Sequence, residues 1–160
     1  MAMEHVALGS FEITASLRVT TTNTAAVWRE RGENGGYFVK LDTRAAAIAT
    51  GADSLISVEL LEDGNHDNIV GLLRSVDGPD TDLTGNILLV AGDVEVEGGG
   101  TGALTAAMLA DGVGIQGDAD GKAEINTTPA NTFGRVIGGT QARPRVSFMS
   151  CLLRDNTNIG

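Results

Sequence analysis

The feature that most constrains the fold of this chain is a series of short segments in which apolar and polar residues alternate. From residue 11 to residue 19 every odd position is apolar and every even position is polar. This period of two is typical of a β-strand with one buried face. We therefore predict a strand at 11–19 and further short strands at 26–31, 37–41, 55–61, 68–76, 87–90, 94–97, 112–116, 123–126, 134–137 and 145–149.

Glycine-containing turns separate these segments. Glycine adopts positive φ without steric cost, and a neighbouring aspartate or asparagine hydrogen-bonds its own backbone, so these residues favour tight turns. Short strands at this spacing predict an all-β fold, either a small β-barrel or a β-sandwich. We expect the turns at 35–36, 63–65, 77–79, 91–93, 120–121 and 138–139.

Two short helices and two chain ends complete the predicted organisation. An alanine-rich run predicts a helix at 42–51, and two apolar residues four positions apart predict another at 101–112. Residues 1–10 are expected to form an extended, flexible N-terminal arm, and residues 155–160 a C-terminal tail. Between them we expect one β-rich domain, residues 11–154.

The composition limits the core that this chain can build. Aromatic residues make up 4% of its 160 residues, whereas 22 residues are glycine. Glycine loses more conformational entropy on folding than any other residue, and small side chains bury little apolar surface to offset that loss. Burial of further surface against copies of the same chain would add stability, so we expect a homo-oligomer.

Charge is distributed unevenly along the chain. Residues 53–124 hold fifteen acids and two bases, whereas residues 126–160 hold four arginines and one acid. A strongly acidic segment repels nucleic acid and anionic membranes. We therefore expect no nucleic acid and no membrane among the partners, but another protein surface, met by the neutral or basic ends of the chain.

No group of residues predicts a reaction, so we expect that the protein is not an enzyme. Cys151 is the single cysteine, and its apolar surroundings in the sequence predict a small core residue. Gly98, Gly100 and Ala103 match a dinucleotide-binding pattern. The strand before them alternates valine with acids, unlike the buried strand that this pattern requires, which favours a glycine-rich hairpin loop. We expect no cofactor.

Two acidic clusters leave a binding function open. Residues 118–124 resemble the start of a calcium loop, although the glycine comes too early and no acid occupies the closing position. Residues 62–67 place His66 among three carboxylates. A solvated turn is our preferred interpretation of each cluster. The alternative is a ligand- or metal-binding β-barrel with acidic loops around His66 or Asp118.

The segments 54–76, 86–97, 112–116, 134–139 and 145–148 share valine-rich strands, regular glycine spacing and acidic turns. Together they resemble the tailed-phage head decoration, or capsid cement, proteins. The resemblance implies a small β-barrel or β-sandwich that binds the major capsid protein on the outside of an expanded shell and clamps neighbouring subunits. It also implies a homotrimer in preference to a dimer, and a place on the capsid exterior of the virion after synthesis in the host cytoplasm. A tail or fibre module is the alternative among virion proteins.

A contact with a shell can use the N-terminal segment. An arm that adds a strand to a capsid sheet gains affinity from main-chain hydrogen bonds, which leave little sequence signal. Under this hypothesis residues 4–18 form the arm. The expected partner-binding residues are Phe11, Ile13, Leu17 and Arg18, with Arg143 and Arg145 as a second contact.

Overall fold

The fold is described from a computed structural model, which covers residues 11–42, 55–61, 68–99, 105–106, 112–118, 120–125 and 132–153. Strands dominate this part of the chain, and one helix lies between the first two strands. The elements are β1 (Phe11–Leu17), α1 (Ala25–Asn34), β2 (Tyr37–Leu41), β3 (Ser57–Leu60), β4 (Ile69–Asp77), β5 (Thr84–Leu89), β6 (Ala91–Glu95), β7 (Gly114–Gly117), β8 (Ala123–Ile125), β9 (Gly134–Gly139) and β10 (Pro144–Met149).

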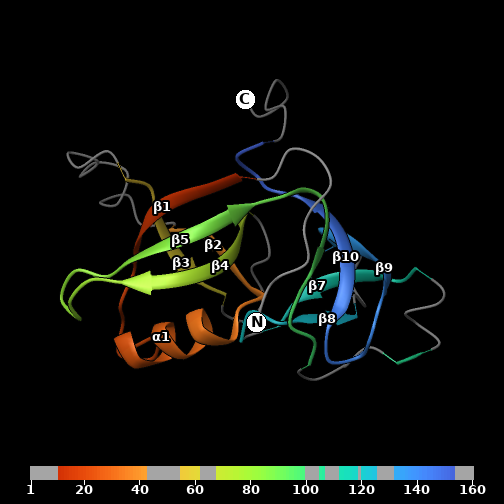
Figure 1. Ribbon diagram of the computed structural model, residues 1–160, viewed down its shortest axis with the longest axis horizontal. Helices are drawn as coiled ribbons and strands as arrows, with labels where there is room; N and C mark the ends of the chain where they lie inside the picture. The colour runs from red at the N-terminus through yellow and green to blue at the C-terminus, as the bar shows by residue number, and fades with distance from the viewer. Residues whose placement is uncertain are drawn as a thin grey trace.

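The first five strands form a closed barrel in the order β1-β3-β2-β4-β5, with β5 returning to β1 (Figure 1). Strand β1 runs antiparallel to β5, from the pair Phe11 and Leu89 to the pair Ser16 and Thr84. On its other side β1 meets β3 in a parallel contact of only two residue pairs. This short contact closes the barrel. The predicted all-β fold with a small barrel is confirmed.

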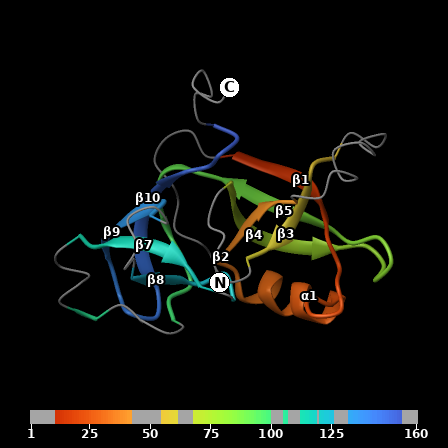
Figure 2. The same ribbon diagram turned by 180° about the vertical axis from the view of Figure 1, so that it is seen from behind.

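The other five strands form a second sheet in the order β6-β10-β9-β7-β8, which lies beside the barrel along the long axis of the molecule (Figures 1 and 2). The residues that follow β6 form main-chain hydrogen bonds with β8, the strand at the other end of this sheet, and with the residues just before β10. The N–H of Ala123 in β8 donates to Glu97 O at 2.8 Å, and the N–H of Gly98 donates to Ala142 O at 2.9 Å, just before β10. The sheet is therefore curled, and its outer strands meet through residues 96–99.

Main-chain hydrogen bonds also join the second sheet to the barrel. The N–H of Phe38 in β2 donates to Gly121 O at 2.8 Å, and the N–H of Glu97 donates to Gly36 O at 2.8 Å. Gly121 has a φ of +82°, and a Cβ at this position would lie 2.9 Å from Phe38 O. Only glycine fits both the conformation and the space, so the β7–β8 turn approaches the barrel at this residue.

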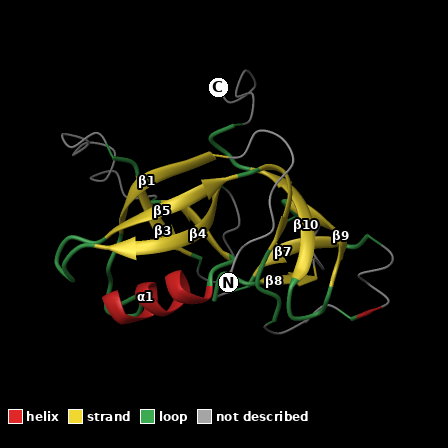
Figure 3. Ribbon diagram, in the orientation of Figure 1, coloured by secondary structure: helices red, strands yellow, loops and turns green. Residues whose placement is uncertain are grey.

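Apolar side chains form one cluster inside the barrel and another between the barrel and the second sheet. Strands β4 and β5 belong to the barrel, which lies beside the second sheet (Figure 3). Both strands supply residues to both clusters, so both of their faces are buried. A strand that is buried on two faces needs no polar alternation. This explains the continuous apolar runs at 69–73 and 87–90.

The segment 26–31, predicted to be a strand, belongs instead to α1. Thr24 caps the helix, because its Oγ1 accepts a hydrogen bond from the backbone N–H three residues later. Gly35 ends it at a φ of +70°, with its N–H 2.9 Å from Arg31 O. The helix packs on the barrel beside β4, and Trp28 is fully buried in the barrel core. The strand prediction was wrong because these capping residues and good helix formers determine the local conformation.

Each of the other predicted strands overlaps an observed strand. The turn expected at 91–93 is wrong, because these residues lie within β6 and pair with β10. Gly92 stands opposite Phe148 there and has a φ of +148°, a backbone conformation that favours glycine. Several expectations lie outside the described residues: the arm at 1–10, the tail at 155–160, and nearly all of both predicted helices.

Candidate partner-binding surface

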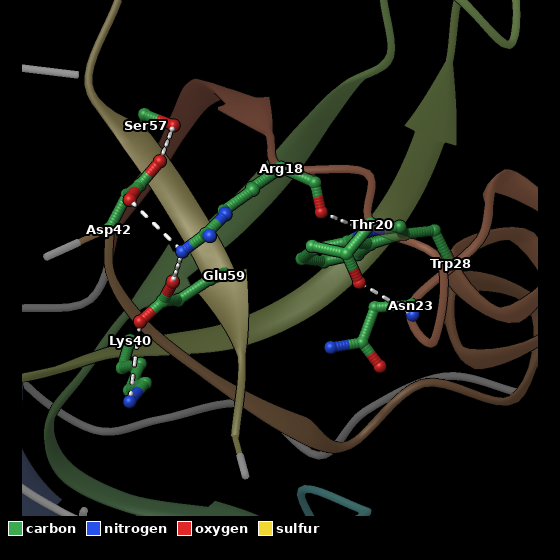
Figure 4. A network of polar contacts seen from close by, with 8 residues as sticks. All are labelled: Arg18, Thr20, Asn23, Trp28, Lys40, Asp42, Ser57 and Glu59. Carbon is green, nitrogen blue, oxygen red and sulfur yellow. Dashed lines mark hydrogen bonds and ion pairs between the residues drawn. The ribbon is translucent and has the colours of Figure 1, made fainter. Parts of the chain in front are cut away.

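A cluster of charged side chains lies on the barrel where β1, β2 and β3 meet (Figure 4). Arg18, directly after β1, places Nη1 2.6 Å from Glu59 Oε2 of β3. Lys40 of β2 places Nζ 3.3 Å from the other oxygen of the same carboxylate, Glu59 Oε1. Both Lys40 and Glu59 are buried. The Glu59 carboxylate of β3 therefore contacts one cation that directly follows β1 and one cation in β2.

Asp42, at the end of β2, completes this cluster. Its side chain is fully buried; Oδ2 accepts a hydrogen bond from Ser57 Oγ at 2.9 Å, and Oδ1 lies 3.6 Å from Arg18 Nη1. Its backbone N–H donates to Ser57 O at 2.9 Å. Two cations and two carboxylates balance one another, which buried charges require. The cluster thus holds the short contact between β1 and β3 together.

A turn after the cluster leads the chain from β1 into α1. Trp28 donates its Nε1–H to Arg18 O at 2.9 Å. Within the turn, the N–H of Asn23 donates to Thr20 Oγ1 at 2.8 Å and the N–H of Thr20 donates to Asn23 O at 3.0 Å. Figure 4 draws the bond from Trp28 to Arg18 O and the bond from the N–H of Asn23 to Thr20 Oγ1. These bonds fix the backbone of Arg18 against the helix.

The partner-binding residues expected near the N-terminus belong to the barrel itself. Phe11 begins β1 and pairs with β5. Ile13 is half-buried against the barrel core, and Leu17 is buried in it. Arg18 is held in the charged cluster. The expectation that residues 11–18 extend from the fold as part of an arm is therefore corrected, because the backbone of β1 already pairs with β5 and its apolar side chains already fill the core.

Arg143 lies in the turn between β9 and β10, and its guanidinium points towards the end of α1. Nη2 donates to Asn34 O at 3.0 Å, and Nη1 donates to Gly35 O at 3.4 Å. Nη1 also lies 3.1 Å from Glu97 Oε2. The last carbonyls of a helix lack partners within the helix and carry a partial negative charge, so a cation is favoured there. Arg143 thus joins the second sheet to the helix.

Arg145 lies on the outer side of β10, opposite Glu95 in β6. It is half-buried, and Glu95 Oε1 also lies 3.9 Å from Arg143 Nε. Arginines from the basic C-terminal segment therefore stand beside acids from the acidic middle segment. These neighbours bring the basic and acidic segments of the sequence together, so the C-terminal arginines do not form a separate basic surface.

The outer side of β9 and β10 carries exposed side chains that alternate with core residues. Ile137 is 51% exposed and Met149 is 45% exposed, the highest values among the large apolar side chains that the structure describes. Arg135 stands opposite Ser147 in the antiparallel register. We define the β9–β10 face as Arg135, Ile137, Arg145, Ser147 and Met149. Of these five, sequence reasoning proposed only Arg145; Ile137 and Met149 each follow another apolar residue, so alternation gave no signal that they are exposed.

The Asp118 carboxylate, considered above as an ion ligand, is engaged by its own hairpin turn. Oδ1 accepts hydrogen bonds from the N–H groups of Asp120 at 2.9 Å and Lys122 at 2.8 Å. Burial raises the pKa of Asp118, and these two hydrogen bonds oppose the rise. Among the described residues no group of three or more His, Cys, Asp or Glu side chains is placed to hold a metal ion, and His66 lies outside them.

The same turn packs against Arg31 of α1. Asp118 Oδ2 and Arg31 Nη1 are buried, and neither has a hydrogen-bond partner within the described part of the chain. Arg31 Nη2 lies 3.6 Å from Asp120 Oδ1, and its guanidinium carbon is 5.5 Å from the centre of the Tyr37 ring. Burial lowers the pKa of Arg31, and the nearby charge of Asp120 opposes this effect. The turn thus places two acids beside one buried cation.

Cys151 is buried and belongs to the barrel core, as predicted. Its N–H donates to Ile69 O at 2.9 Å, which fixes the chain after β10 against β4. It forms no disulfide. A thiol enclosed in apolar surroundings is unreactive, so its position is that of a packing residue.

Comparisons with known proteins add no relative: no protein-family model, no curated protein and no solved structure matches the chain. Within the described ranges no helix is long and apolar enough to cross a membrane. The function is therefore argued from the geometry of the fold and from the resemblance noted in the sequence.

Proposed function

We propose that this protein is a structural virion protein that decorates the outside of a phage capsid and stabilises the shell by clamping neighbouring major capsid proteins. In this proposal it acts by binding alone, catalyses no reaction and uses no cofactor. The resemblance of segments between residues 54 and 150 to capsid cement proteins supports the proposal. The small barrel with its attached second sheet is the kind of fold that this resemblance implies.

The observation that carries the proposal is the β9–β10 face. Closure of the barrel gives each of its five strands two neighbours, so the barrel offers little main-chain pairing to a partner. The charged cluster and Arg143 are engaged within the fold. The β9–β10 face, by contrast, presents Ile137, Met149 and Arg135 on a rigid sheet. Apolar side chains grouped with arginine are typical of the centre of a protein interface.

We further propose that the protein is a homo-oligomer, a trimer in preference to a dimer. The chain contains few large side chains, and contacts between copies would bury additional surface. A trimer at a three-fold position of the lattice would present three β9–β10 faces together. Linked contacts raise the effective concentration of each one, so a small face on each copy is sufficient for firm binding. Multi-angle light scattering measures the mass of the oligomer.

The proposed function is tested by co-sedimentation of the purified protein with empty, expanded capsid shells of its source virus, with bound copies counted at low and high salt. We expect saturable binding at a copy number that matches the three-fold or two-fold positions of the shell. Absence of binding at both salt concentrations would overturn the proposal. Titration with divalent cations would then test the ligand- or metal-binding barrel that the acidic loops around His66 and Asp118 leave as the alternative.

A further inference from the structure

We infer that the β9–β10 face binds a patch on the shell protein that combines carboxylates with apolar side chains, and that Arg135 recognises the carboxylates. The inference rests on the proposed function and names the surface that meets the shell. It follows from the exposure of Arg135, from the residues around it and from the acidic turn at the other end of the molecule.

Arg135 is exposed, in a chain that has 21 acids and 11 bases. Among the described residues the side chain of Arg135 makes no ion pair or hydrogen bond, so within that part of the chain its guanidinium is available to a carboxylate from outside. Lys122 likewise makes no ion pair within these ranges, but it is half-buried. Six other described cations make ion pairs, namely Arg18, Arg29, Arg31, Lys40, Arg74 and Arg143.

Small neighbours keep Arg135 accessible. Ser147 of β10 stands opposite it on one side and Gly114 of β7 on the other. Met149 lies two residues along β10 from Ser147 and projects from the same side of the sheet at a spacing of about 7 Å. Ile137 lies two residues along β9 from Arg135, where the pairing of β9 with β10 shifts register, and it is exposed. The planar guanidinium offers a pair of parallel donors to a carboxylate. The flanking apolar side chains can exclude water from that bond, which strengthens it.

The turn between β4 and β5 is acidic and lies at the far end of the long axis from β9 and β10 (Figure 1). Its acids Asp77, Asp80 and Asp82 are exposed, and Asp80 pairs with Arg29. This turn repels a patch that carries carboxylates, whereas Arg135 attracts one locally. The second sheet also carries acids, among them Glu95 opposite Arg145, so the attraction comes from Arg135 itself and not from the net charge of that end.

Shell binding by substituted proteins tests the inference. We expect Arg135→Glu to lower the affinity for shells by on the order of tenfold or more, and Ile137→Ala to lower it several-fold. Arg135→Lys keeps the charge but loses the paired donors, so its affinity should lie between those of the unsubstituted protein and Arg135→Glu. Binding by Arg135→Glu should also depend less on salt.

Two controls match these substitutions on the barrel. Arg74→Glu makes the same change of charge at a side chain that is 39% exposed. Val19→Ala shortens an apolar side chain that is 41% exposed. Both control proteins should bind shells as the unsubstituted protein does. Circular dichroism of every variant confirms that the fold is intact before binding is compared.

The possible results separate the inference from the proposed function. If the unsubstituted protein binds shells and Arg135→Glu and Ile137→Ala bind equally well, the β9–β10 face is the wrong surface, and the decoration role stands. If the unsubstituted protein does not bind, both fall. If Arg135→Glu forms a smaller oligomer in light scattering, the face joins copies of this chain and its assignment to the shell is overturned.

Discussion

The ring of Phe38 in β2 lies edge-on to the ring of Phe148 in β10, with centroids 5.5 Å apart and ring planes at 82°. Phe133 meets both rings edge-on, with centroids 4.8 Å from Phe38 and 6.0 Å from Phe148. Phe38 belongs to the barrel, whereas the other two rings belong to the second sheet. Edge-to-face pairs add stability beyond the area that they bury. This contact therefore joins the barrel and the second sheet into one packed body.

We expect Phe148→Ala to lower the free energy of unfolding by about 3–5 kcal/mol, because it leaves a cavity and removes two ring contacts. Urea unfolding followed by circular dichroism measures the change. Ser147→Ala, at the exposed neighbouring position, should alter the free energy by less than about 0.5 kcal/mol. Similar small losses in both variants would show that the junction between barrel and sheet is not tightly packed.

Loss of the Arg143 side chain should separate the second sheet from the end of α1. We expect Arg143→Ala to lower the free energy of unfolding by about 1–3 kcal/mol, because the carbonyls of Asn34 and Gly35 lose a charged donor. Hydrogen exchange should become faster in the last turn of α1. Arg145→Ala is the matched control, since its side chain projects from the outer side of β10. An unchanged exchange rate in α1 after the Arg143 substitution would contradict this assignment.

Removal of one member of the charged cluster should destabilise the barrel more than removal of an oppositely charged pair. Glu59→Leu leaves Lys40 buried without its carboxylate and should cost about 3–5 kcal/mol. The double variant with Lys40→Met restores the balance of charge, so it should recover about 1–3 kcal/mol relative to the sum of the single effects. A double-mutant cycle in chemical unfolding measures this coupling. Additive effects would show that the two side chains do not act together.

Asp118 should make stability depend on pH in a predictable direction. Its pKa is raised in the folded protein, whereas in the unfolded chain it has the ordinary value of about 3.9. The folded state thus holds this proton more tightly. The stability gained from protonated Asp118 is fully present below the ordinary pKa and is lost as pH rises through the raised one.

Asp118→Asn stays uncharged and should remove this dependence. We expect the unfolding free energy of the unsubstituted protein, minus that of Asp118→Asn, to fall as the pH rises from about 3, below the ordinary pKa, through the raised pKa. Chemical unfolding at several pH values gives this difference directly. A difference that stays constant or rises over this range would contradict the expected sign.

Most strands were predictable because their pattern is local. The alternation at 11–19 and the apolar runs at 69–73 and 87–90 each produced a correct strand. The segment 26–31 was misassigned because the capping roles of Thr24 and Gly35 were not weighed against a short apolar run. The pairing of β1 with both β5 and β3 was not predictable, since closure of a barrel depends on contacts between distant segments.

The candidate site was less predictable than the fold. Sequence reasoning proposed Arg18 as part of the N-terminal arm and Arg143 as a second, basic contact, yet both make ion pairs with acids distant in the sequence. The position of Arg145 opposite Glu95 in the register of β10 and β6 was equally hidden. Arg135 gave no local signal that set it apart from the other arginines.

The sequence by itself determined the all-β class, the turns at Gly78 and Gly121, and the buried position of Cys151, because periodicity, backbone freedom and hydrophobicity act over a few residues. Only the tertiary structure decided which charges are used internally and which remain at the surface. Ion pairs form between side chains that the strand order brings together, and that order is set by burial of the whole apolar core rather than by any local segment.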